Sequence, residues 1–502
     1  MEKDNTIESS LTLSKKIQVQ DGLVNQPENN HNSIKGETCN LSVHPDCSDH
    51  IEADLAVIRG DAIGTTLYSE RFVLSTLLKL TKLEKELSEN DSFENDLCTI
   101  WDMTIEEDVV QLLLEHNVLE LFADCIFATN DKRLVEILVG ILGNMCNFKE
   151  SRDALVNDTS LVQTLLDLTN CSDSPTLLQL TRLFSVVLIH ADRGTALHWY
   201  QHISLCPDFI KNIIFILSNS INEQLLRQTI ETLNAILAKF ALIEPNQKVP
   251  KNNYDDDSDN TVLLPTFEQL FVNASLIKAT TEAFLALLPR RDNAELHEIH
   301  DDDNGDVEST IVLTQSTHNL MQIFLNIHCI LTQYDNLSQN SYFPHIESLM
   351  DCLGCILEPL CNPKYIEHLT NQEQDLLESI NDIFESLGDP FDERCLIYTI
   401  SIWNLLRLEN ERLARKTPPG NDFEDIAFKD DEFNFETGYL TILNMIVRVI
   451  NAATDQQLEN ALKENLDDNM RNLQSTLSIG DNNQPSKRCY LKIRNVLENL
   501  QQ

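Results

Sequence analysis

Residues 118–145 have the sequence VLELFADCIFATNDKRLVEILVGILGNM, in which a polar turn separates two apolar segments. Within both segments the apolar residues recur at intervals of three and four, which is the period of an amphipathic helix. The same order of segments returns in residues 161–188 (LVQTLLDLTNCSDSPTLLQLTRLFSVVL) and 209–237 (FIKNIIFILSNSINEQLLRQTIETLNAIL). These three stretches therefore predict a repeated pair of helices.

The spacing of the three stretches indicates the type of repeat. They begin at residues 118, 161 and 209, and so at intervals of 43 and 48 residues. Armadillo and HEAT units are about 40–47 residues long. One unit cannot cover its own apolar face, so neighbouring units must stack, and stacking produces a solenoid with a concave surface. We predict an all-α fold of the armadillo/HEAT-like type, a right-handed α-solenoid.

The composition agrees with long helices around an aliphatic core. The 502 residues include only 13 Gly and 15 Pro, and 42% are hydrophobic but only 6% aromatic. Few turn residues are typical of helical proteins, and aliphatic side chains suit helix-on-helix packing. The 13 cysteines lie mostly in apolar helical contexts, and the first residues lack the apolar core of a signal peptide. We therefore expect reduced thiols in an intracellular protein that is not secreted.

The charge of the chain limits its partners. It has 80 acidic and 37 basic residues, which give a formal net charge of −43. Such a polyanion repels phosphate backbones and anionic lipid surfaces, so we expect no nucleic acid and no membrane partner. A basic protein is the natural complement, although the acidic residues could equally serve only to keep a large repeat protein in solution.

Changes in polarity divide the chain into parts. These are a disordered N-terminal arm at 1–58, an armadillo-like repeat block at 59–243, an acidic linker loop at 244–266, a helical repeat continuation at 267–415 interrupted by an acidic loop at 289–310, a further acidic loop at 416–436, and C-terminal helices at 437–502. The first helical stretch of the continuation is expected at 267–288. The loops are predicted to be disordered spacers or regulatory segments.

Three stretches carry a family resemblance. They are GDAIGTTLYSERFVLST at 60–76, NDLCTIWDMTIEEDVVQLLLEHN at 95–117 and EILVGILGNM at 136–145. Over residues 60–240 the sequence resembles the serum amyloid A-like family (synoviocyte proliferation-associated protein). The resemblance implies an armadillo-type helical repeat fold, a location in the nucleus with the cytoplasm as a further compartment, a role in promoting cell proliferation, and no catalytic activity.

Asn144, Ser185 and Asn234 are the candidate partner-binding residues. Asn144 lies where armadillo repeats commonly place an asparagine on their third helix, and there the side-chain amide can bind the main chain of an extended peptide. Asn234 falls at the matching place of the third stretch, and either Ser185 or Val186 at that of the second. Alternatively, Asn144 forms hydrogen bonds only within its own repeat, and the sequence leaves both interpretations open.

A second binding mode is capture of basic cargo by a receptor that resembles a transport factor. Nuclear-import adaptors place a tryptophan one turn before the asparagine, where it stacks on lysine stems. Here the corresponding residues are Gly140, Thr181 and Ile230, which argues against a tryptophan–asparagine ladder. The whole chain has only three tryptophans, Trp101, Trp199 and Trp403. The first is part of Trp101-Asp102-Met103, which we expect to precede a helix capped by Thr104.

A third hypothesis is a metal-dependent enzyme. Cys352 and Cys355 in CLGC, or His297 and His300 in HEIH, would have to converge with further ligands to bind zinc. The chain has no GxGxxG, GxxxxGK[ST] or GxSxG motif. We therefore expect no catalytic residue, no metal ligand, no cofactor and no small-molecule substrate. The sequence favours a non-enzymatic protein-binding adaptor or scaffold in a nuclear or cytosolic assembly that supports cell proliferation.

Overall fold

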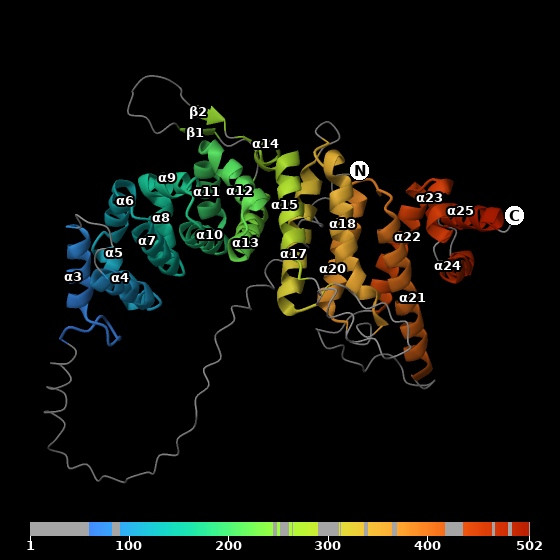
Figure 1. Ribbon diagram of the computed structural model, residues 1–502, viewed down its shortest axis with the longest axis horizontal. Helices are drawn as coiled ribbons and strands as arrows, with labels where there is room; N and C mark the ends of the chain where they lie inside the picture. The colour runs from blue at the N-terminus through green and yellow to red at the C-terminus, as the bar shows by residue number, and fades with distance from the viewer. Residues whose placement is uncertain are drawn as a thin grey trace, which may run out of the picture. The chain divides into compact units, whose positions relative to one another are not determined.

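The computed structural model (Figure 1) describes residues 60–82, 91–243, 248–250, 261–263, 265–289, 311, 313–335, 340–363, 369–416, 435–463, 467–479 and 484–500. All described helices belong to the unit Asp61–Gln502. The predicted arm at 1–58, all but the first residue of the predicted loop at 289–310, and residues 417–434 of the loop at 416–436 lie outside the described residues.

The elements of the first half are mainly helices, most of which form groups of three. They are α3 (Glu70–Leu80), α4 (Asp91–Met103), α5 (Glu107–Glu115), α6 (Val118–Ala128), α7 (Lys132–Met145), α8 (Lys149–Asn157), α9 (Thr159–Leu168), α10 (Ser174–Ile189), α11 (Arg193–Leu205), α12 (Pro207–Asn219), α13 (Glu223–Phe240), β1 (Lys248–Pro250) and β2 (Thr261–Leu263). Each predicted helix pair (α6–α7, α9–α10 and α12–α13) follows a further helix, α5, α8 or α11, which completes a three-helix unit of the armadillo type.

The second half continues with longer and less regular units. Its elements are α14 (Phe267–Phe271), α15 (Ala274–Leu287), α17 (Gln315–Tyr334), the 3₁₀ helices η4 (Phe343–His345) and η5 (Glu358–Cys361) on either side of α18 (Ile346–Leu357), α20 (Asn371–Ser386), α21 (Glu393–Lys416), α22 (Phe435–Ala452), α23 (Asp455–Lys463), α24 (Asp467–Ile479) and α25 (Gln484–Leu500).

Equivalent helices stack in two rows. In the second-helix row, α6, α9, α12, α15, α18 and α21 each pack on the next member. In the third-helix row, α4, α7, α10, α13, α17, α20, α22 and α25 do the same, as can be followed in Figure 1. Because every contact in these rows joins a repeat to its neighbour, the structure confirms an armadillo-like α-solenoid. The third-helix row continues into the C-terminal helices.

Side-chain caps in or just after the predicted polar turns set the start of the third helices. The Asp131 carboxylate accepts hydrogen bonds from the main-chain N–H groups of Arg133 and Leu134, at 3.0 and 3.2 Å, at the start of α7. Asp173 caps α10 and Asn222 caps α13 in the same way. Each such cap stabilises a helix by about 0.5–2 kcal/mol.

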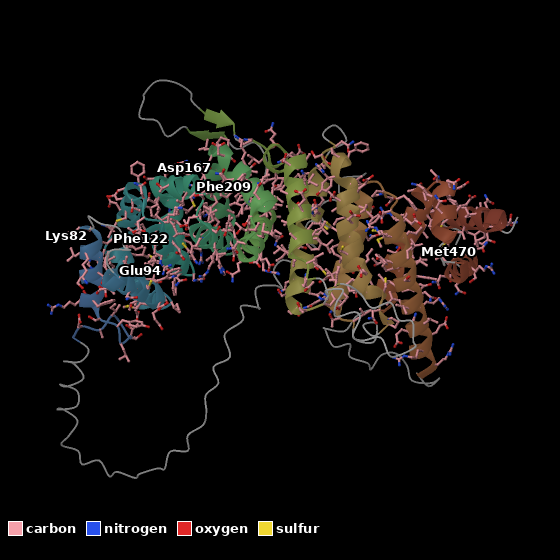
Figure 2. The ribbon with its side chains drawn as sticks, in the orientation of Figure 1. Lys82, Glu94, Phe122, Asp167, Phe209 and Met470 are labelled. Atoms are coloured by element: carbon pink, nitrogen blue, oxygen red, sulfur yellow. The ribbon has the colours of Figure 1, made fainter. Side chains whose placement is uncertain are left out.

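The core between the two rows is mainly aliphatic, with a few large rings. Phe122 and Phe209 are fully buried and are labelled in Figure 2. Phe184 meets both Trp199 and Phe209 edge to face, at centroid distances of 5.9 and 5.4 Å. Burying a side chain of this size contributes about 1.5–3 kcal/mol, so this packing between repeats dominates the stability of the stack.

The predicted acidic linker at 244–266 contains a short pair of strands. β1 and β2 pair antiparallel, with Val249 opposite Val262. Tyrosines hold the chain at both ends of this segment: Tyr334 donates a hydrogen bond to the carbonyl of Ala241 at 2.8 Å, and Tyr200 donates to that of Pro265 at 2.7 Å. The insertion is therefore attached to the solenoid on both sides.

Two local predictions were wrong. Residues 267–288 form two helices, α14 and α15, because the Asn273 side chain accepts a hydrogen bond from Leu276 N at 2.9 Å and starts a new helix. Thr104 caps no helix. It is buried after the last turn of α4 and donates to the carbonyl of Trp101 at 2.6 Å, while α5 begins only at Glu107.

Candidate protein-binding surface

The three residues predicted to bind a partner all lie in the third-helix row. Asn144 is in α7, Ser185 in α10 and Asn234 in α13, so the solenoid places them on successive members of one row. Their side chains, however, have different surroundings: Asn144 and Ser185 are buried, whereas Asn234 is half-buried. Partner binding by these residues stays a prediction.

The amide of Asn144 is used inside the protein. Its Nδ2 donates to the Trp101 carbonyl at 3.1 Å and lies 3.4 Å from the Thr104 hydroxyl oxygen, and its Oδ1 accepts from a guanidinium nitrogen of Arg182 at 3.2 Å. These bonds join three members of the row, α4, α7 and α10. Of the two interpretations left open by the sequence, hydrogen bonding inside the protein describes this geometry better, although the bonds cross between repeats.

Asn234 is in the opposite situation. Its Oδ1 is buried and has no hydrogen-bond partner among the described residues. A buried acceptor without a donor is unfavourable by about 1–3 kcal/mol. Asn234 therefore keeps an acceptor that no described residue uses, whereas both polar groups of the Asn144 amide are already bonded.

The tryptophan that the sequence pattern lacks at Gly140 is supplied by the preceding helix of the row. A Cβ placed on Gly140 would lie closer than 3.0 Å to three atoms of the Trp101 ring, the farthest of them being Cη2 at 2.6 Å. The indole therefore lies directly on the main chain of α7 at this residue. Trp101 itself is half-buried.

The charges along the row change from one end to the other. On α7, Arg133 pairs with Glu94 and Glu136 at 2.7 and 2.8 Å, and these two carboxylates raise the pKa of its guanidinium. Glu94 is labelled in Figure 2. On α13, burial raises the pKa of Glu231, and nearby Arg227 opposes this effect. Farther along, α17 has no Asp, Glu, Lys or Arg, and α20 has five carboxylates and no Lys or Arg.

The stretches that carried the family resemblance meet at the first repeats. Asp108 accepts hydrogen bonds from the main-chain N–H and the hydroxyl of Thr65, at 2.7 and 2.8 Å, and these bonds lower the pKa of its carboxyl. Gly64, at a φ of 52°, lets the loop approach this carboxylate closely. Residues from all three stretches therefore lie in one connected part of the structure, from Thr65 through Trp101 to Asn144.

Sequence reasoning missed Trp101 and Arg182 as parts of this surface. One signal was available, because a glycine inside an apolar helix is unfavourable and suggests close approach by another group. Arg182 carried no comparable signal. Its place beside Asn144 depends on how the repeats stack.

The cysteines considered as zinc ligands do not form a metal site in the part of the chain that the structure describes. Cys352 is buried, burial raises the pKa of its thiol, and the thiol lies 3.7 Å from the Thr281 carbonyl. Within the described ranges, no three His, Cys, Asp or Glu side chains are placed to hold a metal ion. His297 and His300 lie outside those ranges. None of the described helices combines the length and the apolar character needed to cross a bilayer.

Comparison with curated proteins confirms the resemblance seen in the sequence. The chain is 35% identical over 193 residues to Protein SAAL1 of Homo sapiens, a match that covers 36% of this chain and 40% of that protein. It is 34% identical over 196 residues to Protein saal1 of Xenopus tropicalis, covering 36% of this chain and 42% of that protein. The match thus spans less than half the length of these relatives. No family model matches the chain.

Solved structures that overlap with the chain include armadillo-repeat proteins. SYS-1 has a TM-score of 0.41 and 12% identity, over 85% of this chain and 62% of SYS-1. A designed armadillo repeat protein has a TM-score of 0.34 and 10% identity, over 62% of this chain and 98% of that chain. The α-solenoid fold follows from the helix packing described above, independently of these overlaps.

Proposed function

We propose that this protein is a non-enzymatic scaffold that binds another protein along the solvent-exposed face of the third-helix row. The observation that carries the proposal is the group formed by Trp101, Asn144 and Arg182. It combines the half-buried Trp101 with the exposed Arg182, and the Asn144 amide bonds to the main-chain carbonyl of Trp101 and to the guanidinium of Arg182. Tryptophan and arginine are the side chains most enriched among the residues that dominate protein–protein affinity.

We further propose that the scaffold acts in a nuclear or cytosolic assembly that supports cell proliferation. Support comes from the resemblance carried by residues 60–240. A fluorescent fusion of the full chain should accumulate in the nucleus, and depletion of the protein should slow cell division. An exclusively cytoplasmic fusion, together with unchanged growth after depletion, would remove this part of the proposal.

Site-specific photo-crosslinking tests the binding surface. Ile189 ends α10 in the third-helix row and is 44% exposed, and Phe215 on α12 in the second-helix row is 66% exposed. Both are large apolar side chains, so a benzophenone amino acid can replace either with similar disturbance. We expect a defined crosslinked protein from position 189 and not from position 215, and Arg182→Ala should weaken it. Equal crosslinking from both positions, or none from 189, would contradict the proposal.

A further inference from the structure

The exposed side of α25 is basic, although the net charge of the chain is strongly negative. The helix has the sequence QPSKRCYLKIRNVLENL, with four basic residues and one glutamate. The whole chain, in contrast, has 80 acidic and only 37 basic residues. In Figure 1, α25 is the last helix of the third-helix row, beside the end marked C. The charge of this helix is therefore opposite in sign to that of the chain.

Helical spacing places three of the basic residues and a leucine on one side of α25. The helices α22, α23 and α24 pack on α25, and its apolar side is buried. Lys487, Leu491 and Arg494 follow one another at intervals of four and three, and Arg488 lies three residues before Leu491, so all four share one helix face. All four are exposed, and Leu491 is 45% exposed. We call these four residues the basic face.

Two cations of the basic face have no acidic partner. The side chains of Lys487 and Arg488 form no ion pair with any described residue, whereas Arg494 pairs with Glu498 on the same helix at 2.7 Å. The fourth base, Lys492, lies outside the basic face and donates to a main-chain carbonyl of α22 at 3.3 Å. At physiological salt a charge acts over only about 8 Å. A ligand at the basic face therefore meets positive charge despite the net charge of the chain.

We propose that the basic face of α25 binds a short acidic segment of a partner protein, whose carboxylates pair with Lys487 and Arg488 and whose apolar side chain covers Leu491. Charge complementarity selects the occupant, because the rest of the chain repels carboxylates and this face attracts them. The guanidinium of Arg488 can bind a carboxylate with two parallel hydrogen bonds. The inference goes beyond the proposed function, which rests on residues of α4, α7 and α10.

The size of the basic face limits the length of the segment. Lys487 and Arg494 are about 10 Å apart along α25, which matches about three residues of extended chain. Nucleic acids and anionic membranes are wider arrays of charge and would also meet the acidic residues elsewhere on the chain. A second copy of the chain would bring a further net charge of −43 towards this face. A short acidic segment avoids both sources of repulsion.

Two labelled peptides, titrated with the full chain and followed by fluorescence anisotropy, test the chemistry of the occupant. Each has about ten residues, with two glutamates on either side of a central residue that is leucine in one peptide and serine in the other. Both carry the same charge, so the protein repels them equally at long range. We expect the leucine peptide to bind about threefold more tightly than the serine peptide. Equal affinities, or no binding of the leucine peptide, would overturn the inference.

Matched charge variants test the two unpaired cations. Lys487→Gln with Arg488→Gln should weaken binding of the leucine peptide about fivefold. The control, Lys211→Gln with Lys278→Gln, removes the same charge from exposed positions on α12 and α15 and should change affinity less than about twofold. An equal loss in both variants would indicate long-range attraction only and would contradict binding at α25.

Matched apolar variants test the leucine. Leu491→Ser should abolish the difference between the two peptides, because the apolar contact is gone. Leu408→Ser changes a leucine of similar exposure, 47%, on α21 and should leave that difference unchanged. Circular dichroism verifies that each variant is folded. A difference that survives Leu491→Ser would refute the contact with Leu491.

The same variants distinguish the proposed occupant from others. Tighter binding of a single-stranded DNA of about ten nucleotides, or of vesicles containing phosphatidylserine, would assign the basic face to another ligand and overturn the inference. Self-association in analytical ultracentrifugation that disappears in Lys487→Gln with Arg488→Gln would assign it to a second copy, with the same consequence. Crosslinking from position 189 that persists while the peptide tests fail would leave the scaffold proposal intact and remove only the inference about α25.

Discussion

Replacement of Gly140 by alanine should loosen the first repeats, because the new methyl group competes with the Trp101 ring for space. The nearest ring atoms would be closer than 3.0 Å, and even Cη2 would be at 2.6 Å. To regain a carbon–carbon contact of about 3.5 Å, the indole must move by about 1 Å or more. Overpacking of this kind costs about 1–3 kcal/mol.

Two further contributions to the free energy of unfolding act in opposite directions. Displacement of Trp101 would also weaken the bond from Asn144 to its carbonyl, which contributes about 1 kcal/mol. Alanine in place of glycine favours the helix by about 1 kcal/mol, which offsets that loss. The net destabilisation should therefore be about 1–3 kcal/mol. Gly143→Ala in the same helix is the control, since its Cβ would meet Leu183 Cβ at an ordinary 3.8 Å.

Hydrogen exchange followed by mass spectrometry measures this difference locally. Amides of α4 and α7 should exchange faster in Gly140→Ala, by about 5-fold to 150-fold, and no faster than wild type in Gly143→Ala. In a Trp101→Ala background the ring is gone, so Gly140→Ala should no longer destabilise. The reasoning is refuted if Gly140→Ala and Gly143→Ala exchange alike, or if Gly140→Ala destabilises equally with and without the indole.

Three further predictions concern buried polar groups. Burial lowers the pKa of His328 to about 3, so the free energy of unfolding should fall as pH drops from about 6.5 towards 3, a slope that His328→Gln should remove in urea titrations. Burial alone would raise the pKa of Glu373, but hydrogen bonds from His318 and Thr370 lower it to about 2. Its stabilisation, present above the ordinary value of 4.5, should be lost as pH falls towards 2, and Glu373→Gln should flatten that part of the titration. Asn144→Ala should lower stability by about 1–3 kcal/mol in thermal unfolding, whereas Asn234→Ala should leave it unchanged or raise it by up to about 1–3 kcal/mol, because the Asn234 acceptor has no donor to lose and its burial is unfavourable.

The repeat was predictable because its evidence is local. Apolar periodicity and a polar turn mark the helices of each unit. The caps seen in the structure are Asp131 and Asp173 within the first two predicted turns, and Asn222 two residues after the third, which was predicted at 218–220. The break at Asn273 follows the same chemistry. It was missed because an asparagine within an apolar stretch is compatible with either a cap or a helix interior.

The candidate surface was less predictable because its contacts join residues far apart in the chain. Trp101 reaches Gly140 across one repeat, and Arg182 reaches Asn144 across the next. A periodic pattern identifies which face of a helix is apolar, but not which neighbour covers its polar positions. The same limit applies to Thr104, whose position suggested a cap and whose hydroxyl instead bonds to the Trp101 carbonyl.

Carboxyl footprinting of the full chain, with and without the captured partner, tests most directly whether the third-helix row is the binding surface. Partner binding should protect Glu231 on α13 and Asp382 on α20 from labelling. Asp124 on α6 and Asp167 on α9, both exposed in the second-helix row, should label at an unchanged rate. Protection of Asp124 and Asp167 with continued labelling of Glu231 and Asp382 would contradict the account.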